Sequence, residues 1–218
     1  MERYTSETPQ TLKDKLVNFW YYHKLKVLAG FLILCALAVA VNSCVKKDSI
    51  DLYVLYMVNG AYSETEIDAL SEKLKVYADD LDGDGEKRVQ VITVCFSDVL
   101  ARTDQTQEGT LARLVSQIAS GPAVFYVFDE PNYQALKETK ADVFEDIGGL
   151  CRTTPYLEKD RFNATQAGVL SDIEFYKNSE KDFYFGMRNT AGITEKDSRY
   201  TQIEQCKNVL SRIMQAYS

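Results

Sequence analysis

The chain has 218 residues, with 25 Lys and Arg against 32 Asp and Glu, one histidine and five cysteines. Only five of the basic and three of the acidic residues precede residue 46, so residues 46–218 carry a net charge of −9, a poor match for nucleic acid or anionic lipid. The histidine is His23, and residues 46–218 therefore offer no Ser-His-Asp or Cys-His nucleophile system and no ordinary histidine-containing zinc site.

An uncharged apolar run covers residues 27–41. The wider segment 25–45, in which Lys26 can snorkel toward the headgroups, reaches the roughly 20 residues that a membrane-spanning helix needs. Aromatic residues at 20–22 precede this segment, where an interfacial belt is expected, and all five basic residues of this part precede the apolar run 27–41. The positive-inside rule therefore predicts a single-pass cell-membrane anchor at 25–45, with residues 1–24 cytoplasmic and the C-terminal domain extracellular.

Two other uses of the apolar run stay open. Residues 38–40 are Ala-Val-Ala, which is typical of a signal-peptidase site, but the 26 residues before the run are long for the basic segment of a signal peptide. Cys44 follows a small residue, as bacterial lipidation requires, although Asn42 fits that pattern poorly. The flanking charges and aromatic residues favour an uncleaved anchor over both alternatives and over a buried helix of a soluble protein.

After a short linker at 46–49, a domain over residues 50–218 alternates strand and helix patterns. Runs rich in aromatic and β-branched residues predict strands over 50–58, 89–96, 123–128 and 182–188. Helices are predicted from the Ser63–Glu66 capping box with an apolar face reaching Leu81, at 111–119, from Asp129 to about 140, and along the stripe from Tyr200 to Tyr217. Residues 141–180 show no regular pattern. The alternation favours an α/β domain with a mainly parallel sheet covered by helices.

One motif carries metal chemistry. Residues 80–85 have the sequence Asp-Leu-Asp-Gly-Asp-Gly, the first half of an EF-hand-like calcium loop, in which alternate carboxylates converge and Gly85 permits the turn. The predicted ligands are Asp80, Asp82, Asp84 and Glu86, the last through its backbone carbonyl. The twelfth position is Val91, which cannot supply the usual bidentate carboxylate, so a further ligand must come from elsewhere in the fold. We expect a weak structural calcium site; the alternative is a solvated turn, where Asp and Gly are common.

Polar residues follow two of the predicted strands. They are Ser97 and Asp98 after the second strand, and Asp129 and Glu130 after the third. Because the crevice at the carboxyl ends of parallel strands often holds ligands, these four residues are candidate ligand-binding groups on one rim of the sheet. The alternative is helix capping and ordinary loop polarity.

The cysteines show no close-spaced disulfide pattern. Cys35 and Cys44 lie at the predicted membrane segment, whereas Cys95, Cys151 and Cys206 lie in the domain. Two arrangements of the three domain cysteines stay open: one disulfide with one free thiol, or three buried thiols. The strand-like surroundings of Cys95 and the helical apolar stripe around Cys206 favour three buried thiols.

Three short motifs carry a family resemblance. They are the run from Phe19 to Lys24, residues 77–85 with the acidic loop, and the run from Phe128 to Pro131. With the layout of anchor and domain, they make the chain resemble uncharacterised single-pass membrane-anchored extracytoplasmic proteins of Firmicutes-type Gram-positive bacteria. The resemblance spans most of the chain and implies no activity. The α/β pattern also resembles a lobe of solute-binding proteins, a likeness of fold alone.

The missing histidines and the lack of a nucleophile motif favour a membrane-tethered extracytoplasmic domain that binds or interacts rather than catalyses. Such a domain would serve as an accessory subunit of an envelope or transport complex. Its expected partners are the membrane, through residues 25–45, and other envelope proteins, with structural calcium as the only expected cofactor. Two alternatives stay open: a small-molecule receptor domain of the solute-binding kind, and a carboxylate-dependent envelope enzyme at the strand-end rim.

Overall fold

The computed structural model describes residues 12–45, 49–60, 62–94, 115–116, 118–139, 142–151, 154–197 and 199–217, with the side chains of 14–18 and 38–45 excepted. The chain divides into two compact units, Met1–Asp48 and Ser49–Ser218. Cys95, Ser97 and Asp98 lie outside the described residues, as does most of the helix predicted at 111–119, of which residues 115–116 and 118–120 are helical.

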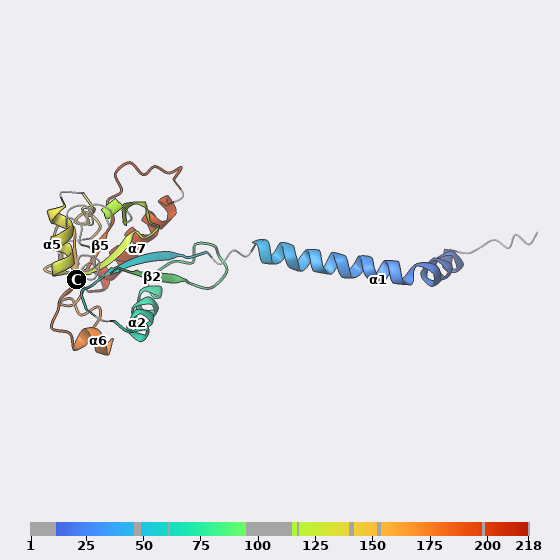
Figure 1. Cartoon of the computed structure of the whole chain (residues 1–218), viewed down its shortest axis with the longest axis horizontal. Coiled ribbons are helices and arrows are strands. Elements are labelled where there is room, and N and C mark those ends of the chain that lie inside the picture. The colour runs from blue at the N-terminus through green and yellow to red at the C-terminus, as the bar shows by residue number, and fades with distance from the viewer. Residues whose placement is uncertain are drawn as a thin grey trace, which may run out of the picture. The chain divides into compact units, whose positions relative to one another are not determined.

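The first unit contains one long helix, α1 (Leu12–Val45), drawn in blue in Figure 1. Its 34 residues correspond to about 51 Å at the usual rise of 1.5 Å per residue. Its stretch Phe19–Leu37 is long and apolar enough to cross a membrane, and none of that stretch is buried. Length and composition of this kind fit both a membrane anchor and a signal sequence.

The second unit is built on a five-stranded sheet with the order β2-β1-β3-β5-β4. Its strands are β1 (Leu52–Met57), β2 (Val89–Thr93), β3 (Phe125–Asp129), β4 (Phe162–Asn163) and β5 (Phe183–Met187). β1 pairs in parallel with β2 and β3, whereas β5 runs antiparallel to both β3 and β4. The predicted mainly parallel sheet is therefore not confirmed, because the sheet is mixed. Between β4 and β5 no long crossover helix returns the chain to the far edge, so β5 must run back against its neighbours.

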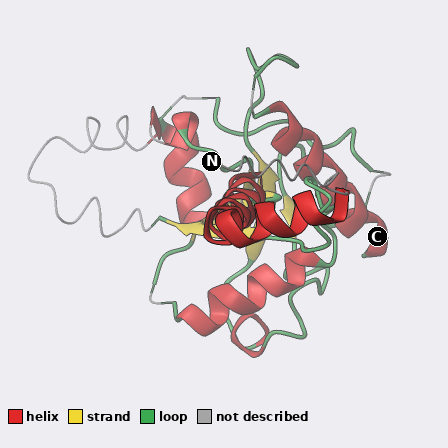
Figure 2. Ribbon diagram, turned by 90° about the vertical axis from the view of Figure 1, so that its right-hand side faces the viewer, coloured by secondary structure: helices red, strands yellow, loops and turns green. Residues whose placement is uncertain are grey.

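Besides the helical residues at 115–116 and 118–120, the described part of the second unit has four helices beside the sheet (Figure 2). They are α2 (Glu64–Lys75), α5 (Glu130–Glu138), α6 (Glu174–Lys177) and α7 (Tyr200–Ala216). The predicted capping box of α2 is present, because the Ser63 hydroxyl accepts the Glu66 N–H and the Glu66 carboxylate accepts the Ser63 N–H. The prediction that α2 continues toward Leu81 is wrong. The helix ends at Lys75, and the chain turns so that the Leu81 N–H reaches the carboxylate of Asp51.

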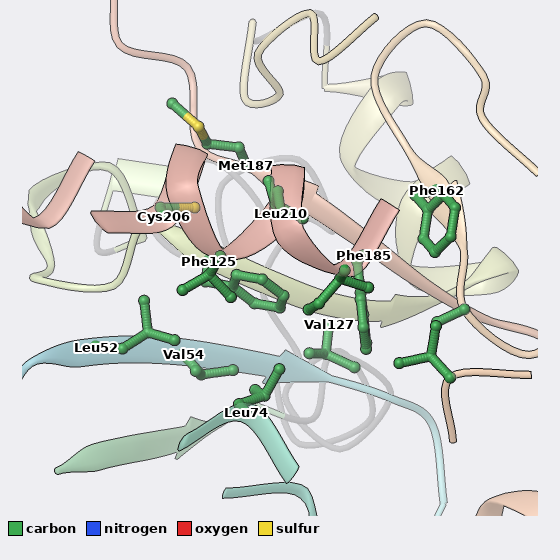
Figure 3. Packing of buried hydrophobic residues seen from close by; sticks show 14 of the residues in the cluster. Leu52, Val54, Leu74, Phe125, Val127, Phe162, Phe185, Met187, Cys206 and Leu210 are labelled. Atoms are coloured by element: carbon green, nitrogen blue, oxygen red, sulfur yellow. The ribbon is translucent and has the colours of Figure 1, made fainter. Parts of the chain in front are cut away.

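Each face of the sheet has its own hydrophobic cluster. Along β3 successive side chains alternate between them, as the pleat requires: Phe125 and Val127 on one side, Tyr126 and Phe128 on the other. The first cluster includes Leu74 of α2 and the buried stripe of α7 (Figure 3). The second includes residues of α5 and the aromatic side chains Phe144 and Tyr184. α2 and α7 therefore cover one face, and α5 covers the other.

The cysteines of the second unit that the structure describes are free thiols. Cys206 is fully buried in α7, where its Sγ lies 3.6 Å from the carbonyl oxygen of Val124. Burial raises the pKa of this thiol well above its ordinary value. Cys206 thus packs as a small apolar side chain, while Cys151 is partly exposed.

Candidate functional site

The acidic loop between α2 and β2 is held by hydrogen bonds from its own backbone. The carboxylate of Asp80 accepts N–H bonds from Gly83 and Gly85, both at 2.7 Å. These glycines have φ angles of 70° and 88°, which favour glycine over other residues. The Gly85 N–H holds the pKa of the Asp80 carboxyl below its ordinary value. The loop geometry is thus complete as a hydrogen-bonded turn.

The carboxylates of three of the four predicted calcium-binding residues already face a cation. The guanidinium of Arg88 pairs with the carboxylate of Asp84 and lies 2.7 Å from that of Glu86 and 4.0 Å from that of Asp82. Asp82 also accepts a hydrogen bond from the Ser49 hydroxyl at 2.6 Å. The positive charge that balances this side of the loop therefore comes from the protein itself.

Asp51, directly before β1, is the residue from elsewhere in the fold that reaches the loop. It is fully buried, and its two oxygens accept the N–H groups of Leu81 at 2.8 Å and Arg88 at 2.7 Å. Asp51, Asp80 and Asp82 each contribute one carboxylate oxygen to a group whose members lie within 4.8 Å of one another. Asp51 therefore ties both ends of the loop to the sheet.

This grouping meets only part of what calcium needs. Calcium takes six to eight oxygen ligands, and three carboxylates converge here. Both oxygens of Asp51 already accept backbone N–H groups, so its geometry is explained without an ion. Calcium binding by this loop stays a prediction.

At the predicted rim, Asp129 has a structural role. It is fully buried at the N-cap of α5, where one oxygen accepts the Asn132 N–H. Its other oxygen accepts the Asn59 N–H at 2.9 Å, beyond the end of β1. The carboxylate thus joins the carboxyl ends of two neighbouring parallel strands across the crevice where a ligand was expected.

Glu130 is engaged in the same way. Its carboxylate pairs with Arg161 and accepts a hydrogen bond from Gln134. The Arg161 guanidinium carbon lies 4.3 Å from the ring centre of Tyr133 and 4.4 Å from that of Tyr184, within the usual range for a cation–π contact. The pKa of Glu130 is lowered, because the hydrogen bonds and the charge of Arg161 outweigh desolvation, the largest single cause. Arg161 therefore covers this part of the rim.

A cavity of about 290 Å³ lies at the opposite end of the sheet from the rim. Its floor is formed by buried side chains, among them Ile118, Tyr126, Val143 and Arg188, and exposed residues such as Ala119, Asp142 and Ala191 stand at its edge. The cavity is lined by apolar side chains, one cationic group (Arg188) and one hydroxyl group (Tyr126). A pocket of this composition suits a small ligand with one polar end.

The sequence reasoning missed Asp51, Arg161 and Arg188. Asp51 and Arg188 each lie directly beside a strand that is almost wholly buried and apolar. A charge in that position must find a partner inside the fold, and this adjacency was the available signal. Arg161 lies in the irregular segment 141–180 and carried no comparable signal.

Comparison with protein-family models, curated proteins and solved structures finds no match for the chain. The resemblance to Firmicutes-type membrane proteins therefore stays a prediction.

Proposed function

We propose that the chain is a membrane-anchored protein whose C-terminal α/β unit binds a partner or ligand outside the cytoplasm. The observation that carries this proposal is α1. Its side chains Leu28, Phe31 and Leu32 are 55%, 63% and 60% exposed, and the whole stretch Phe19–Leu37 lies uncovered. Soluble proteins rarely expose a continuous apolar surface of this extent, and a bilayer would cover it.

The form of α1 supports an anchor over a signal sequence. The helix begins at Leu12, well before the apolar run, and continues to Val45. A signal peptide has an apolar core of about 7–15 residues and a short basic segment before it. The basic residues on the amino-terminal side support a cytoplasmic N-terminus, with the unit Ser49–Ser218 on the outer side.

The engaged state of the rim supports binding over catalysis. The carboxylate-dependent enzyme alternative relied on Asp129 and Glu130, and both carboxylates are committed to helix capping, strand linkage or the pair with Arg161. General acid–base work needs a carboxyl within reach of a substrate proton. An accessory role in an envelope or transport complex requires only a surface held close to the membrane.

The test is fractionation and protease protection of the full chain with epitopes at both ends. We expect the intact 24.7 kDa protein in the membrane fraction after carbonate washing, with the C-terminal epitope digested from outside and the N-terminal one protected. Leu32→Lys together with Leu34→Lys, inside the apolar run, should release it to the soluble fraction. A shortened soluble product would show that α1 is a cleaved signal. A protected C-terminal epitope would overturn the orientation.

A second candidate function is a small-molecule receptor domain. The specific observation that favours it is the cavity floored by Tyr126 and Arg188. This candidate uses the same anchor and orientation, and it differs in giving the unit a ligand of its own.

A further inference from the structure

The guanidinium of Arg188 is buried without a carboxylate partner. Only 7% of the residue is exposed, and its Nη1 donates to the carbonyl oxygen of Gly121 at 2.8 Å. Among the described residues no Asp or Glu forms an ion pair with it; the charge of Asp197 acts on it, but that carboxylate is paired with Arg199. Burial lowers the pKa of Arg188 from its ordinary value, yet an arginine stays protonated at neutral pH. Buried charges are normally paired, so this site lacks an anion that would complete it.

Tyr126 lines the same cavity and has an unpartnered hydroxyl. The residue is fully buried, and its hydroxyl has no hydrogen-bond partner within the described part of the chain. Such groups are rare because each costs the free energy of its lost hydrogen bonds to water. An orphan donor and a buried cation thus occur on one cavity floor.

Strand register brings the two groups together. Tyr126 of β3 lies opposite Gly186 of β5, and Arg188 follows two residues after Gly186. Side chains two apart on a strand share a face, and diagonal neighbours on adjacent strands lie about 7–8 Å apart, within reach of long and aromatic side chains. The charge of Arg188 also acts on the pKa of Tyr126, opposing the upward shift that burial causes.

We propose that this cavity binds a small carboxylate with an apolar body, whose carboxylate accepts hydrogen bonds from Arg188 and Tyr126. The planar guanidinium fork matches a carboxylate, and one of its arms is already fixed by Gly121. Val143 and Ile118 supply apolar walls, while Asp142 at the edge disfavours a more highly charged anion such as phosphate. The volume of about 290 Å³ limits the ligand to a small molecule.

This inference rests on the proposed binding function and names its ligand class, but it does not depend on the orientation of α1. The probes are benzoate, phenylacetate and 3-methylbutanoate, with benzamide as the neutral match of benzoate and inorganic phosphate as the anion without an apolar body. Saturation-transfer NMR on the full chain in detergent micelles detects weak binding. We expect at least one carboxylate to bind, and benzamide and phosphate to bind at least tenfold more weakly.

Tyr126→Phe is the decisive variant, because it removes only a hydroxyl that has no partner within the described chain and so leaves the packing intact. It should weaken carboxylate binding about tenfold, the loss expected for one hydrogen bond to a charged group. Tyr56→Phe is the matched control: Tyr56 is also a buried tyrosine, but it belongs to the cluster on the other sheet face, where its hydroxyl lies beside that of Tyr176. It should leave binding unchanged. Arg188→Met should abolish binding.

Three results would overturn the proposal. The first is that none of the three carboxylates binds at about 10 mM, ten times the dissociation constant of a weak site near 1 mM. The second is that benzoate and benzamide bind equally well. The third is that Tyr126→Phe leaves carboxylate binding unchanged. Equal binding of phosphate would likewise refute the carboxylate assignment. None of these results affects the fractionation and protease experiment, so failure of the ligand assignment and failure of the membrane proposal are read separately.

Discussion

Asp51→Asn tests what holds the acidic loop to the sheet. Asp51 is fully buried, and its two oxygens accept N–H groups from Leu81 and Arg88. Asparagine keeps the size and shape of the side chain but replaces one acceptor oxygen with an NH₂ group. That group would face a backbone N–H, so the variant loses one charge-assisted hydrogen bond and leaves a buried donor unsatisfied.

The magnitude follows from those two losses. A hydrogen bond to a charged group contributes about 1.5–3 kcal/mol, and a buried unsatisfied donor costs about 1–3 kcal/mol. The free energy of unfolding should therefore fall by about 3–5 kcal/mol. For a unit of this size each kcal/mol moves the midpoint by roughly 2–4 °C, so the midpoint should fall by about 10 °C.

Near-UV circular dichroism of the full chain in micelles follows tertiary unfolding through the buried aromatic side chains of the second unit, and the signal of Trp20, Tyr21 and Tyr22 in α1 is a background common to all variants. The control is Asp68→Asn, an exposed position on α2, for which we expect a loss within about 0.5 kcal/mol. Equal midpoints for Asp51→Asn and the unaltered protein would refute the hydrogen-bonding argument. If a bound ion rather than Asp51 fastens the loop, a chelator will lower the unaltered protein's midpoint as much as the substitution does.

Calcium binding by the loop predicts that calcium raises the unfolding midpoint of the unaltered protein and not that of Asp82→Ala; equal rises would contradict it. Gly186→Ala should lower the free energy of unfolding, measured by urea titration, by about 1–3 kcal/mol. The reason is that a Cβ there would lie 2.9 Å from Cε1 of Phe128. The control is Gly149→Ala, whose added Cβ has no atom within 4 Å. Burial raises the pKa of Tyr56 to about 12, above about 10 in the unfolded chain. The contribution of Tyr56 to the free energy of unfolding is therefore complete below pH 10 and lost as the pH rises through 12. Between these pH values, the free energy of unfolding of Tyr56→Phe should fall by about 2–3 kcal/mol less than that of the unaltered protein. Equal falls in the two proteins would contradict this.

Much of the fold could be predicted because its main strands are nearly continuous apolar runs. β1 and β5 lie inside the segments where such runs predicted them, and β3 extends one residue past its predicted segment, to Asp129. The start of α2 was equally clear, since the capping box is a local pattern that forms its own hydrogen bonds. These elements are specified by residues close together in the sequence, so no tertiary information was needed to find them.

The direction of β5 and the end of α2 depend on distant contacts. β4 is only two residues long, and the irregular segment before it is fixed by bonds such as that from the Ile147 N–H to the carbonyl oxygen of Lys159. An apolar stripe predicts helix wherever the spacing fits, but the turn after Lys75 is set by Asp51, thirty residues from its partner Leu81. No local pattern encodes these bonds.

The candidate sites divide along the same line. The turn at Asp80 and Gly85 follows from the sequence pattern, and the structure has it. The partners that decide what the loop and the rim can do, Asp51 and Arg161, come from other parts of the chain. The sequence therefore identified the polar groups at the strand ends, but it could not show that other residues of the fold already hydrogen-bond or pair with them.

That distinction decides between the two ends of the sheet. α2 and α5 leave β1 and β3 toward opposite faces, which makes the crevice between these strands the topological switch point where α/β proteins usually bind ligands. Here the bond from the Asn59 N–H to Asp129 joins the strand ends, so the polar groups gain little from a ligand. At the other end, Arg188 has no carboxylate partner among the described residues. Because binding energy comes largely from groups that the fold leaves unsatisfied, we place the proposed ligand at the cavity beside Arg188 despite its unusual position.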